Sequence, residues 1–271
     1  MDYKIIIDSC SDITPEVEEA MGIVTVPIFL RLGEQEYADD ANLNLPEFME
    51  KMKACKEKIS TSAPTPASFA EVMTQDSFVV TLSAALSATY SNAVLAAKEA
   101  LADIHVFDSK TASAGGTLVA IKIRELISSG LPRPQIIESV NKFIDGTKTY
   151  LVLENFENLI KNGRLGAVKG KIASVLNIKL LLGADGNGQI SLHAKARGTK
   201  QMLDKMLGLI SNSGRSTSGE NIVISHCNNQ SLADQLAGLI RQQFDFKEIF
   251  IFPTRGTSSL YGDDKGIIVA F

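Results

Sequence analysis

The protein has 271 residues, of which 45% are hydrophobic and 21% are charged, and its formal net charge is −4 at pH 7. A chain of this length is longer than most single domains, so the composition predicts a globular protein with two domains. The small negative charge and the lack of a lysine or arginine run give no electrostatic footprint for nucleic acid or anionic membranes. We expect neither partner, and no stable insertion into a membrane.

The cysteines and the opening residues indicate the compartment. Cys10, Cys55 and Cys227 are odd in number and far apart, which fits neither a disulfide framework nor a zinc site. The opening MDYKIIIDS enters an apolar run directly, without the basic segment and long apolar stretch of a signal peptide. We therefore expect a cytoplasmic protein whose thiols are idle.

The first half of the chain alternates short apolar runs with amphipathic segments. The runs predict strands at residues 3–7, 23–32, 78–82 and 104–107. Helices are expected between them, with start signals at Pro15, at Pro46 after Asn44 or Leu45, and at Pro66 after Thr65. Two further helices are expected to run to about residue 101 and over 117–127. This alternation predicts a mostly parallel sheet with flanking helices.

Hydroxyl-bearing residues are dense in several of the connecting segments, namely ISTSAPTPASF, SAALSATYSNA and FDSKTASAGG. Each serine or threonine, taken singly, is explained by a helix cap or a turn. In a parallel sheet, however, the loops at the carboxyl ends of the strands meet along one edge, where ligands bind. Neutral donors gathered there can hold an oxygen-rich head group without supplying a base, so the pattern favours binding over catalysis.

The pattern changes near residue 147, and we place the domains at 1–146 and 147–271. The second half combines a hairpin around GADGNG, with strands at 180–182 and 189–195, with further strand and helix alternation. Its helices are expected at 156–161, 169–176, 199–210 and 232–243, and its other strands at 222–225, 248–252 and the closing GIIVAF. The predicted fold is α/β, with two α/β domains of which the second has a mixed sheet.

Catalytic signatures are weak. His105, His193 and His226 are isolated and are expected to be structural or exposed. The chain has no G-x-S-x-G elbow, no phosphate loop and no glycine fingerprint after the first strand, which disfavours serine hydrolases, nucleotide hydrolases and dinucleotide enzymes. Asp8 and Asp12 can be metal ligands or acid–base groups, although capping of the helix that follows is favoured.

Several segments, in order along nearly the whole chain, resemble the DegV family of bacterial fatty acid-binding proteins. They are IIIDSCSDIT, ISTSAPTPASF, LSAALSATYSNA, VFDSKTASAGG, LENFENLIKNGRLGAVKGKIASVLNIKLLL, ADGNGQISLHAKARGTKQ and GIIVAF. The resemblance implies two α/β domains that enclose one long-chain fatty acid, with no further cofactor. It also implies a separate fatty acid kinase as partner, which phosphorylates the presented carboxyl group and feeds phospholipid synthesis.

The resemblance also implies how the carboxylate is bound. The hydroxyls of the family's T-S-x-P corner map onto Thr61 with Ser62 close by, and those of its L-S-G-T-Y segment map onto Ser87. Many members carry a histidine near the C-terminus that approaches the carboxylate, but SLYGDDKG has none. Tyr261 is the nearest replacement with a donor, although Leu260 can equally occupy that place.

Two arginines in family-like segments have a less defined role. Arg164 and Arg197 are candidates for bridging the domains or for facing the kinase, while an ordinary surface position is the default. A basic cluster that could steer an acidic partner, or simply be a solvated helix face, comprises Lys161, Arg164, Lys169 and Lys171.

Three hypotheses of function follow. The first is a non-catalytic carrier that presents a fatty acid to the kinase. The second is a stand-alone metal-dependent phosphotransferase or hydrolase that uses Asp8, Asp12 and Asp108, although no base or phosphate loop supports it. The third is a sensor of another amphiphilic ligand, which only the identity of the ligand separates from the first.

Overall fold

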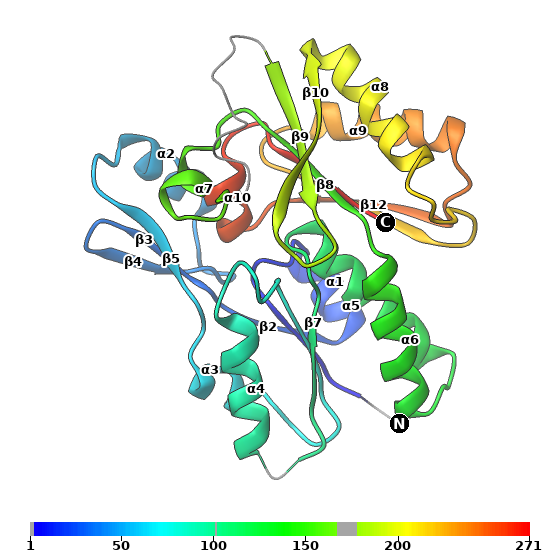
Figure 1. Ribbon diagram of the computed structural model, residues 1–271. Helices are drawn as coiled ribbons and strands as arrows, with labels where there is room; N and C mark the ends of the chain where they lie inside the picture. Colours follow the sequence, from blue (N-terminus) through cyan, green and yellow to red (C-terminus); the bar gives the residue numbers. More distant parts are fainter. Residues whose placement is uncertain (1–2, 101, 167–177) are drawn as a thin grey trace.

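The computed structural model describes residues 3–100, 102–166 and 178–271. These residues form a parallel four-stranded sheet A, an antiparallel three-stranded sheet B and a mixed six-stranded sheet C. Figure 1 shows sheet A and its helices in the lower part of the molecule and sheet C in the upper part, with sheet B projecting to one side. The predicted α/β class, with one parallel and one mixed sheet, is confirmed.

Sheet A has the strand order β2-β1-β6-β7. Its two central strands, β1 (Ile5–Asp8) and β6 (Phe78–Thr81), are buried at every position because helices cover both faces. Its edge strands are β2 (Ile23–Val26) and β7 (His105–Asp108). One face packs against α5 and α6, the other against α3 and α4. The helices around this sheet are α1 (Pro15–Met21), α3 (Pro66–Ala70), α4 (Thr89–Glu99), α5 (Ala114–Ser128) and α6 (Arg133–Gly146).

Two of the predicted helix starts have the expected cap. Asn44 Oδ1 accepts a hydrogen bond from Glu47 N at the start of α2 (Leu45–Ala54). Thr65 Oγ1 accepts one from Ser68 N at the start of α3, with Pro66 in the first turn. Both caps satisfy backbone donors that the first turn of a helix leaves open, so local sequence suffices to place these ends.

The single strand predicted at 23–32 is wrong. The chain leaves sheet A after β2 and enters sheet B as β3 (Phe29–Leu32), with Pro27 between the two strands. Proline has no N–H to donate to a sheet ladder, so the run breaks there. In sheet B, β3 lies between β4 (Gln35–Ala38) and β5 (Ile59–Ser62), so the hydroxyl-rich corner begins as a strand.

Sheet C has the strand order β10-β9-β8-β13-β11-β12, in which only the β11 and β12 pair is parallel. Its helices α8 and α9 pack on one face, and the predicted hairpin is present as β9 and β10. The strands are β8 (Thr149–Leu153), β9 (Ile178–Ala184), β10 (Ile190–Arg197), β11 (Asn221–His226), β12 (Glu248–Pro253) and β13 (Ile267–Ala270). The helices are α7 (Glu157–Lys161), α8 (Gly198–Ser211), α9 (Gln230–Gln243) and α10 (Gly256–Gly262).

Some predicted elements differ from the structure or fall outside it. The pattern did not predict β4, α6 or α10, and the helix expected at 169–176 lies outside the described residues. Helix α10 reads GTSSLYG, which has too few apolar residues to show a helical period. It packs against α2, α7 and β3 and thereby joins the end of the chain to sheet B.

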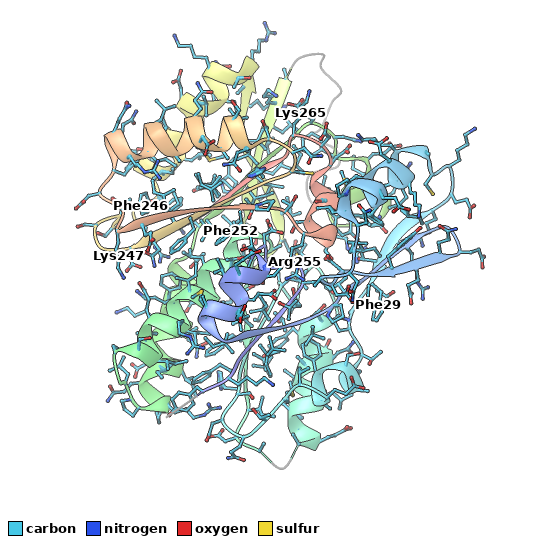
Figure 2. The ribbon with its side chains drawn as sticks, turned by 180° about the vertical axis from the view of Figure 1, so that it is seen from behind. Phe29, Phe246, Lys247, Phe252, Arg255 and Lys265 are labelled. Atoms are coloured by element: carbon cyan, nitrogen blue, oxygen red, sulfur yellow. The ribbon has the colours of Figure 1, made fainter. Side chains whose placement is uncertain are left out.

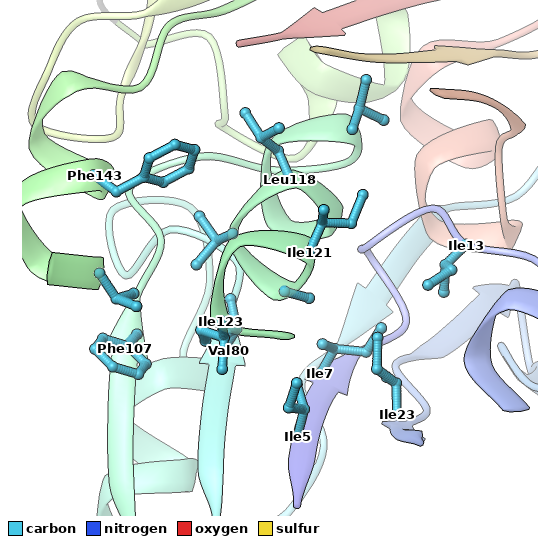
Figure 3. Close-up of a cluster of buried hydrophobic side chains, with 14 of the residues drawn as sticks. Ile5, Ile7, Ile13, Ile23, Val80, Phe107, Leu118, Ile121, Ile123 and Phe143 are labelled. Atoms are coloured by element: carbon cyan, nitrogen blue, oxygen red, sulfur yellow. The ribbon is translucent and has the colours of Figure 1, made fainter. Parts of the chain in front are cut away.

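Helix α5 lies between the two large sheets and contacts β1 and β6 of sheet A and β11 and β13 of sheet C. Its first eight residues are all buried, as expected for a helix end that both sheets cover. Figure 3 shows Leu118, Ile121 and Ile123 of this helix in a core that also contains Ile5 and Val80. Side chains of sheet C join the same core, which therefore crosses the proposed domain boundary at 146/147.

We predict that Leu118→Ala lowers the free energy of unfolding by about 2–5 kcal/mol, because it leaves a cavity in a core that both sheets share. The matched control is Leu95→Ala on α4, where the side chain is 46% exposed and the cost should stay within about 0.5 kcal/mol. Urea titration followed by circular dichroism measures both. Equal small losses at the two positions would contradict the buried position of α5.

Candidate functional site

A cavity of about 900 Å³, including its open mouth, lies between the strand-end loops of sheet A, sheet B and the first strands of sheet C. Most of the surface of its wall is formed by apolar atoms, and its large aliphatic side chains are Ile28, Leu82, Leu86, Leu151, Leu153, Leu159, Ile190 and Ile268. Polar side chains of the wall are Thr61, Ser87, Thr111, Ser113, Thr149, Arg164, Gln189, Thr257, Ser258 and Tyr261.

The strand-end loops of sheet A form one side of this cavity. Residues 82–87 follow β6, and residues 111–113 follow β7 and lead into α5. A backbone hydrogen bond from Ser83 N to Thr111 O, 2.7 Å long, joins the two loops. Because parallel strands end at the same edge, two of the predicted hydroxyl-rich segments meet here.

The β9–β10 hairpin forms the opposite side. Ser83 Oγ donates a 2.9 Å hydrogen bond to Gly188 O at the hairpin turn, so the wall is joined across 105 residues of sequence. Gly188 has a φ of +80°, and a Cβ there would lie 2.0 Å from Ser83 Oγ. Glycine is therefore required both by the backbone conformation and by the close approach of the two loops.

Four polar residues of the cavity wall, Thr61, Ser87, Arg164 and Tyr261, form what we call the polar corner. Thr61 Oγ1 and the Tyr261 hydroxyl oxygen are 2.9 Å apart and share a hydrogen bond. The Arg164 guanidinium lies 5.7 Å from the centre of the Tyr261 ring and donates through Nε to Leu86 O at 3.2 Å. Burial raises the pKa of Tyr261, so the phenol stays neutral at physiological pH.

Ser87 belongs to the loop that Arg164 binds, since Ser87 directly follows Leu86, and its side chain lines the cavity. Its Oγ lies 2.8 Å from Thr89 Oγ1 at the start of α4. Thr61, Ser87, Tyr261 and Arg164, predicted separately from distant segments, are thus brought to one cavity.

Ser62 and Arg197 lie elsewhere. Ser62 follows Thr61 on β5, where successive side chains point to opposite faces, and it is not part of the cavity wall. Its Oγ is buried without a hydrogen-bond partner among the residues that the structure describes. Arg197 is exposed at the end of β10 and is likewise outside the wall.

Buried aspartates order the loops around the cavity. Asp8 accepts hydrogen bonds from Cys10 N (3.0 Å) and Leu82 N (2.6 Å). Asp12 accepts from Arg255 N at 2.9 Å and from the Ser113 hydroxyl. Neither caps α1, so that prediction is wrong: each carboxylate accepts from a backbone N–H far away in sequence, Leu82 N for Asp8 and Arg255 N for Asp12.

Arg255 adds an ion pair to this network. Its guanidinium binds the Glu18 carboxylate on α1, and Figure 2 shows Arg255 beside that helix, between the upper and lower parts of the molecule. The sequence did not indicate Asp39, whose carboxylate accepts from Gly256 N (2.8 Å) and Thr257 N (2.7 Å) in the first turn of α10. Its partners lie more than 200 residues away, beyond the reach of any local pattern.

The aspartates near the cavity are bound to backbone and are not arranged as metal ligands. Asp108 Oδ1 accepts from Ala84 N (3.1 Å) and Lys110 N (3.0 Å), as a loop-forming aspartate does. Within residues 3–100, 102–166 and 178–271, no group of three or more His, Cys, Asp or Glu side chains is placed to hold a metal ion. Asp8, Asp12 and Asp108 therefore work as hydrogen-bond acceptors for backbone in this structure.

Comparisons with known proteins decide the family. A family model described as an uncharacterised protein of the DegV family matches residues 2–265. The chain belongs to the DegV family. A DegV domain-containing protein of Streptococcus pneumoniae is 32% identical to it over 282 aligned positions, which cover 100% of this chain and 99% of the relative.

Solved structures of DegV proteins have the same fold and carry fatty acids. A Ruminococcus gnavus DegV protein, refined with vaccenic acid, is 36% identical with a TM-score of 0.93 and 99% coverage of both chains. The Streptococcus pneumoniae Fatty Acid Kinase (Fak) B3 protein, loaded with linoleic acid, is 31% identical with a TM-score of 0.91 and covers 100% of this chain and 99% of its own. In the described part of this DegV protein, no helix is long and apolar enough to cross a membrane.

We predict that Asp8 makes the fold less stable as the pH rises. Burial raises the pKa of Asp8 from 3.8 to about 7, so in this window the folded chain holds a proton that the unfolded chain has released. Raising the pH therefore favours the unfolded state, and the stabilisation present below pH 3.8 is lost by about pH 7.

The variant Asp8→Asn should show a flatter decline of the free energy of unfolding across that pH window, whatever its absolute stability. Urea titrations at several pH values measure the slope, with the exposed Asp204→Asn on α8 as the matched control. A variant slope as steep as that of the unmodified protein would show that Asp8 titrates normally.

Proposed function

We propose that this DegV protein binds one long-chain fatty acid in the cavity and presents the carboxyl group to a separate fatty acid kinase. The observation that carries the proposal is an aliphatic cavity with one polar corner of hydroxyl groups and an arginine. The fatty acids held by the Ruminococcus and Streptococcus proteins support it, since these share the fold over the whole chain.

The cavity wall supplies the affinity. A chain of about fourteen methylenes gains roughly 11 kcal/mol of gross transfer free energy at ~0.8 kcal/mol each. This is similar to the cost of immobilising a ligand, which is about 4–15 kcal/mol. The acyl chain can therefore offset the loss of ligand freedom, and the head group mainly sets the orientation.

The polar corner suits a carboxylate. Thr61 and Tyr261 share a single hydrogen bond, so one of their two hydroxyl protons is left to donate to a ligand oxygen. Ser87 supplies another hydroxyl, and the Arg164 cation gives a favourable field without a hydrogen bond to Tyr261. In this proposal Tyr261 takes the place of the family's histidine.

The kinase partnership is supported by the likeness to the Fak B3 protein. In our proposal the chain itself does no chemistry, because the aspartates near the cavity are bound to backbone and the polar corner has no base. The kinase then supplies ATP and magnesium. Arg197, exposed beside the cavity-lining hairpin, and Arg164 are the candidates to face that partner.

Native mass spectrometry of protein purified gently from its host, followed by identification of the released ligand, tests the proposal directly. A long-chain fatty acid at one copy per chain is the expected result, together with a higher melting temperature when palmitate or oleate is added. Release of a different amphiphile would favour a sensor. Turnover of ATP or acyl esters by the isolated chain, lost in Asp8→Asn, would favour an enzyme.

We predict that Thr61→Ala and Ser87→Ala each weaken fatty acid binding by about 1–3 kcal/mol, because each removes a donor to the carboxylate. Isothermal titration of delipidated protein with oleate gives the dissociation constants. Ser91→Ala is the matched control, since this serine is exposed on α4 and its hydroxyl only binds Ala88 O. Unchanged affinity and unchanged phosphorylation by the kinase in both test variants would refute the head-group assignment.

A further inference from the structure

Strand β8 runs along the wall of the cavity. Thr149, Leu151 and Leu153 all line it, as alternate residues on one face of a strand do. The four residue steps from Thr149 to Leu153 span roughly 13 Å of the cavity wall. Leu153 marks the end nearer the polar corner, because it shares an apolar cluster with Leu159 against which Tyr261 packs. Thr149 therefore marks the opposite end.

At this opposite end, Thr149 is joined to Thr111. The two hydroxyl oxygens are 2.7 Å apart, and the residues are only 6% and 4% exposed. Thr149 Oγ1 can donate to Thr111 Oγ1, which in turn donates to Ala112 O at 3.4 Å, so neither hydroxyl is left unsatisfied against an acyl chain. We call the Thr111–Thr149 pair the end wall.

The end wall separates the cavity from a second, polar pocket at the surface. Thr111, Thr149 and Ala184 line both spaces, and the outer pocket also includes Lys148 and His193. Space therefore exists on the far side of the two threonines. The two threonines and Ala184 are the residues that lie between the two spaces.

Each half of the end wall is held by a different sheet. Thr149 begins β8 and pairs with Ala270 of β13. Thr111 accepts the Ser83 backbone bond through its carbonyl, and a Cβ at position 115 would lie 2.2 Å from its Oγ1, so Gly115 is needed beside it. Threonine is also stiff at χ1, so the end wall has little freedom to yield to a longer ligand.

We infer that the end wall limits the length of the acyl chain that the cavity accepts. This inference rests on the proposed function and adds the residues that set the specificity. The carboxylate is anchored at the polar corner, so the chain terminus of the longest acid that fits meets the two threonine side chains. A longer acid has to displace the end wall or pull its carboxylate out of the polar corner.

The test is a binding series of saturated fatty acids that differ by two carbons, titrated into delipidated full-length protein. Thr111→Ala/Thr149→Ala removes both methyls and both hydroxyls and opens the cavity toward the outer pocket. The longest tightly bound acid should then be about two carbons longer, and the affinity for it should rise about tenfold. Thr111→Val/Thr149→Val keeps the volume, so the order of preference among chain lengths should be kept.

A further variant, with a larger side chain in the end wall, tests the inference even if the alanine variant does not fold. Thr149→Ile adds volume at the same point and should shift the preference to shorter acids. If the Ala and Ile variants keep the length profile of the unmodified protein, the inference is wrong although the proposed function stands. A changed order of preference in the valine variant would also overturn it, because hydroxyl chemistry would then matter more than volume. If the unmodified protein binds none of the acids, the proposed function itself fails.

Discussion

The burial of α5 between two sheets is the constraint on which the rest of the structure depends. The first eight residues of this helix are all buried and have to be covered, and sheets A and C lie on either side of the helix. The helix begins at Ala114, directly after the cavity-lining residues 111–113. The helix thus keeps the sheets apart, and the cavity occupies the space beyond its first turn.

Buried carboxylates bind hydroxyl groups of the cavity wall, so these hydroxyls are not available to a ligand. Ser113 and Thr257 have hydroxyls in the wall, but these donate to Asp12 and Asp39. Burial removes these carboxylates from water, and this desolvation raises the pKa values of Asp8, Asp12 and Asp39. The pKa of Asp8 rises to about 7 and that of Asp12 to about 6. The hydroxyls of the polar corner bind other hydroxyls and not a carboxylate: Thr61 pairs with Tyr261, and Ser87 pairs with Thr89.

Local sequence predicted the features that depend on local physics. The caps at Asn44 and Thr65 and the hairpin around GADGNG follow from residues a few positions apart. That hydroxyls such as Thr61 and Ser87 gather at one site was expected from the strand-end loops, and their role as carboxylate ligands was implied only by the family resemblance. The change of sheet at Pro27 also has a local signal, but where the chain goes next does not.

What the sequence did not predict depends on contacts across the chain. Asp39 binds the first turn of α10 more than 200 residues later, and no spacing rule connects the two. Thr111 and Thr149 looked like ordinary turn and strand residues, and only the fold makes them a pair. The Ser62 side chain points away from that of Thr61 because the two are successive residues of β5. The sequence did not predict that the hydroxyl-rich corner begins as a strand.

The closure of the cavity also bears on how the protein folds. The hydrogen bonds that complete its wall, Ser83 to Gly188 and Thr61 to Tyr261, join residues 105 and 200 positions apart. Contacts this distant close long loops of the chain, and loop-closure entropy makes such contacts slow to form. A chain emerging from the ribosome has sheet A complete long before Tyr261 exists, so the binding compartment takes shape only after synthesis is nearly over.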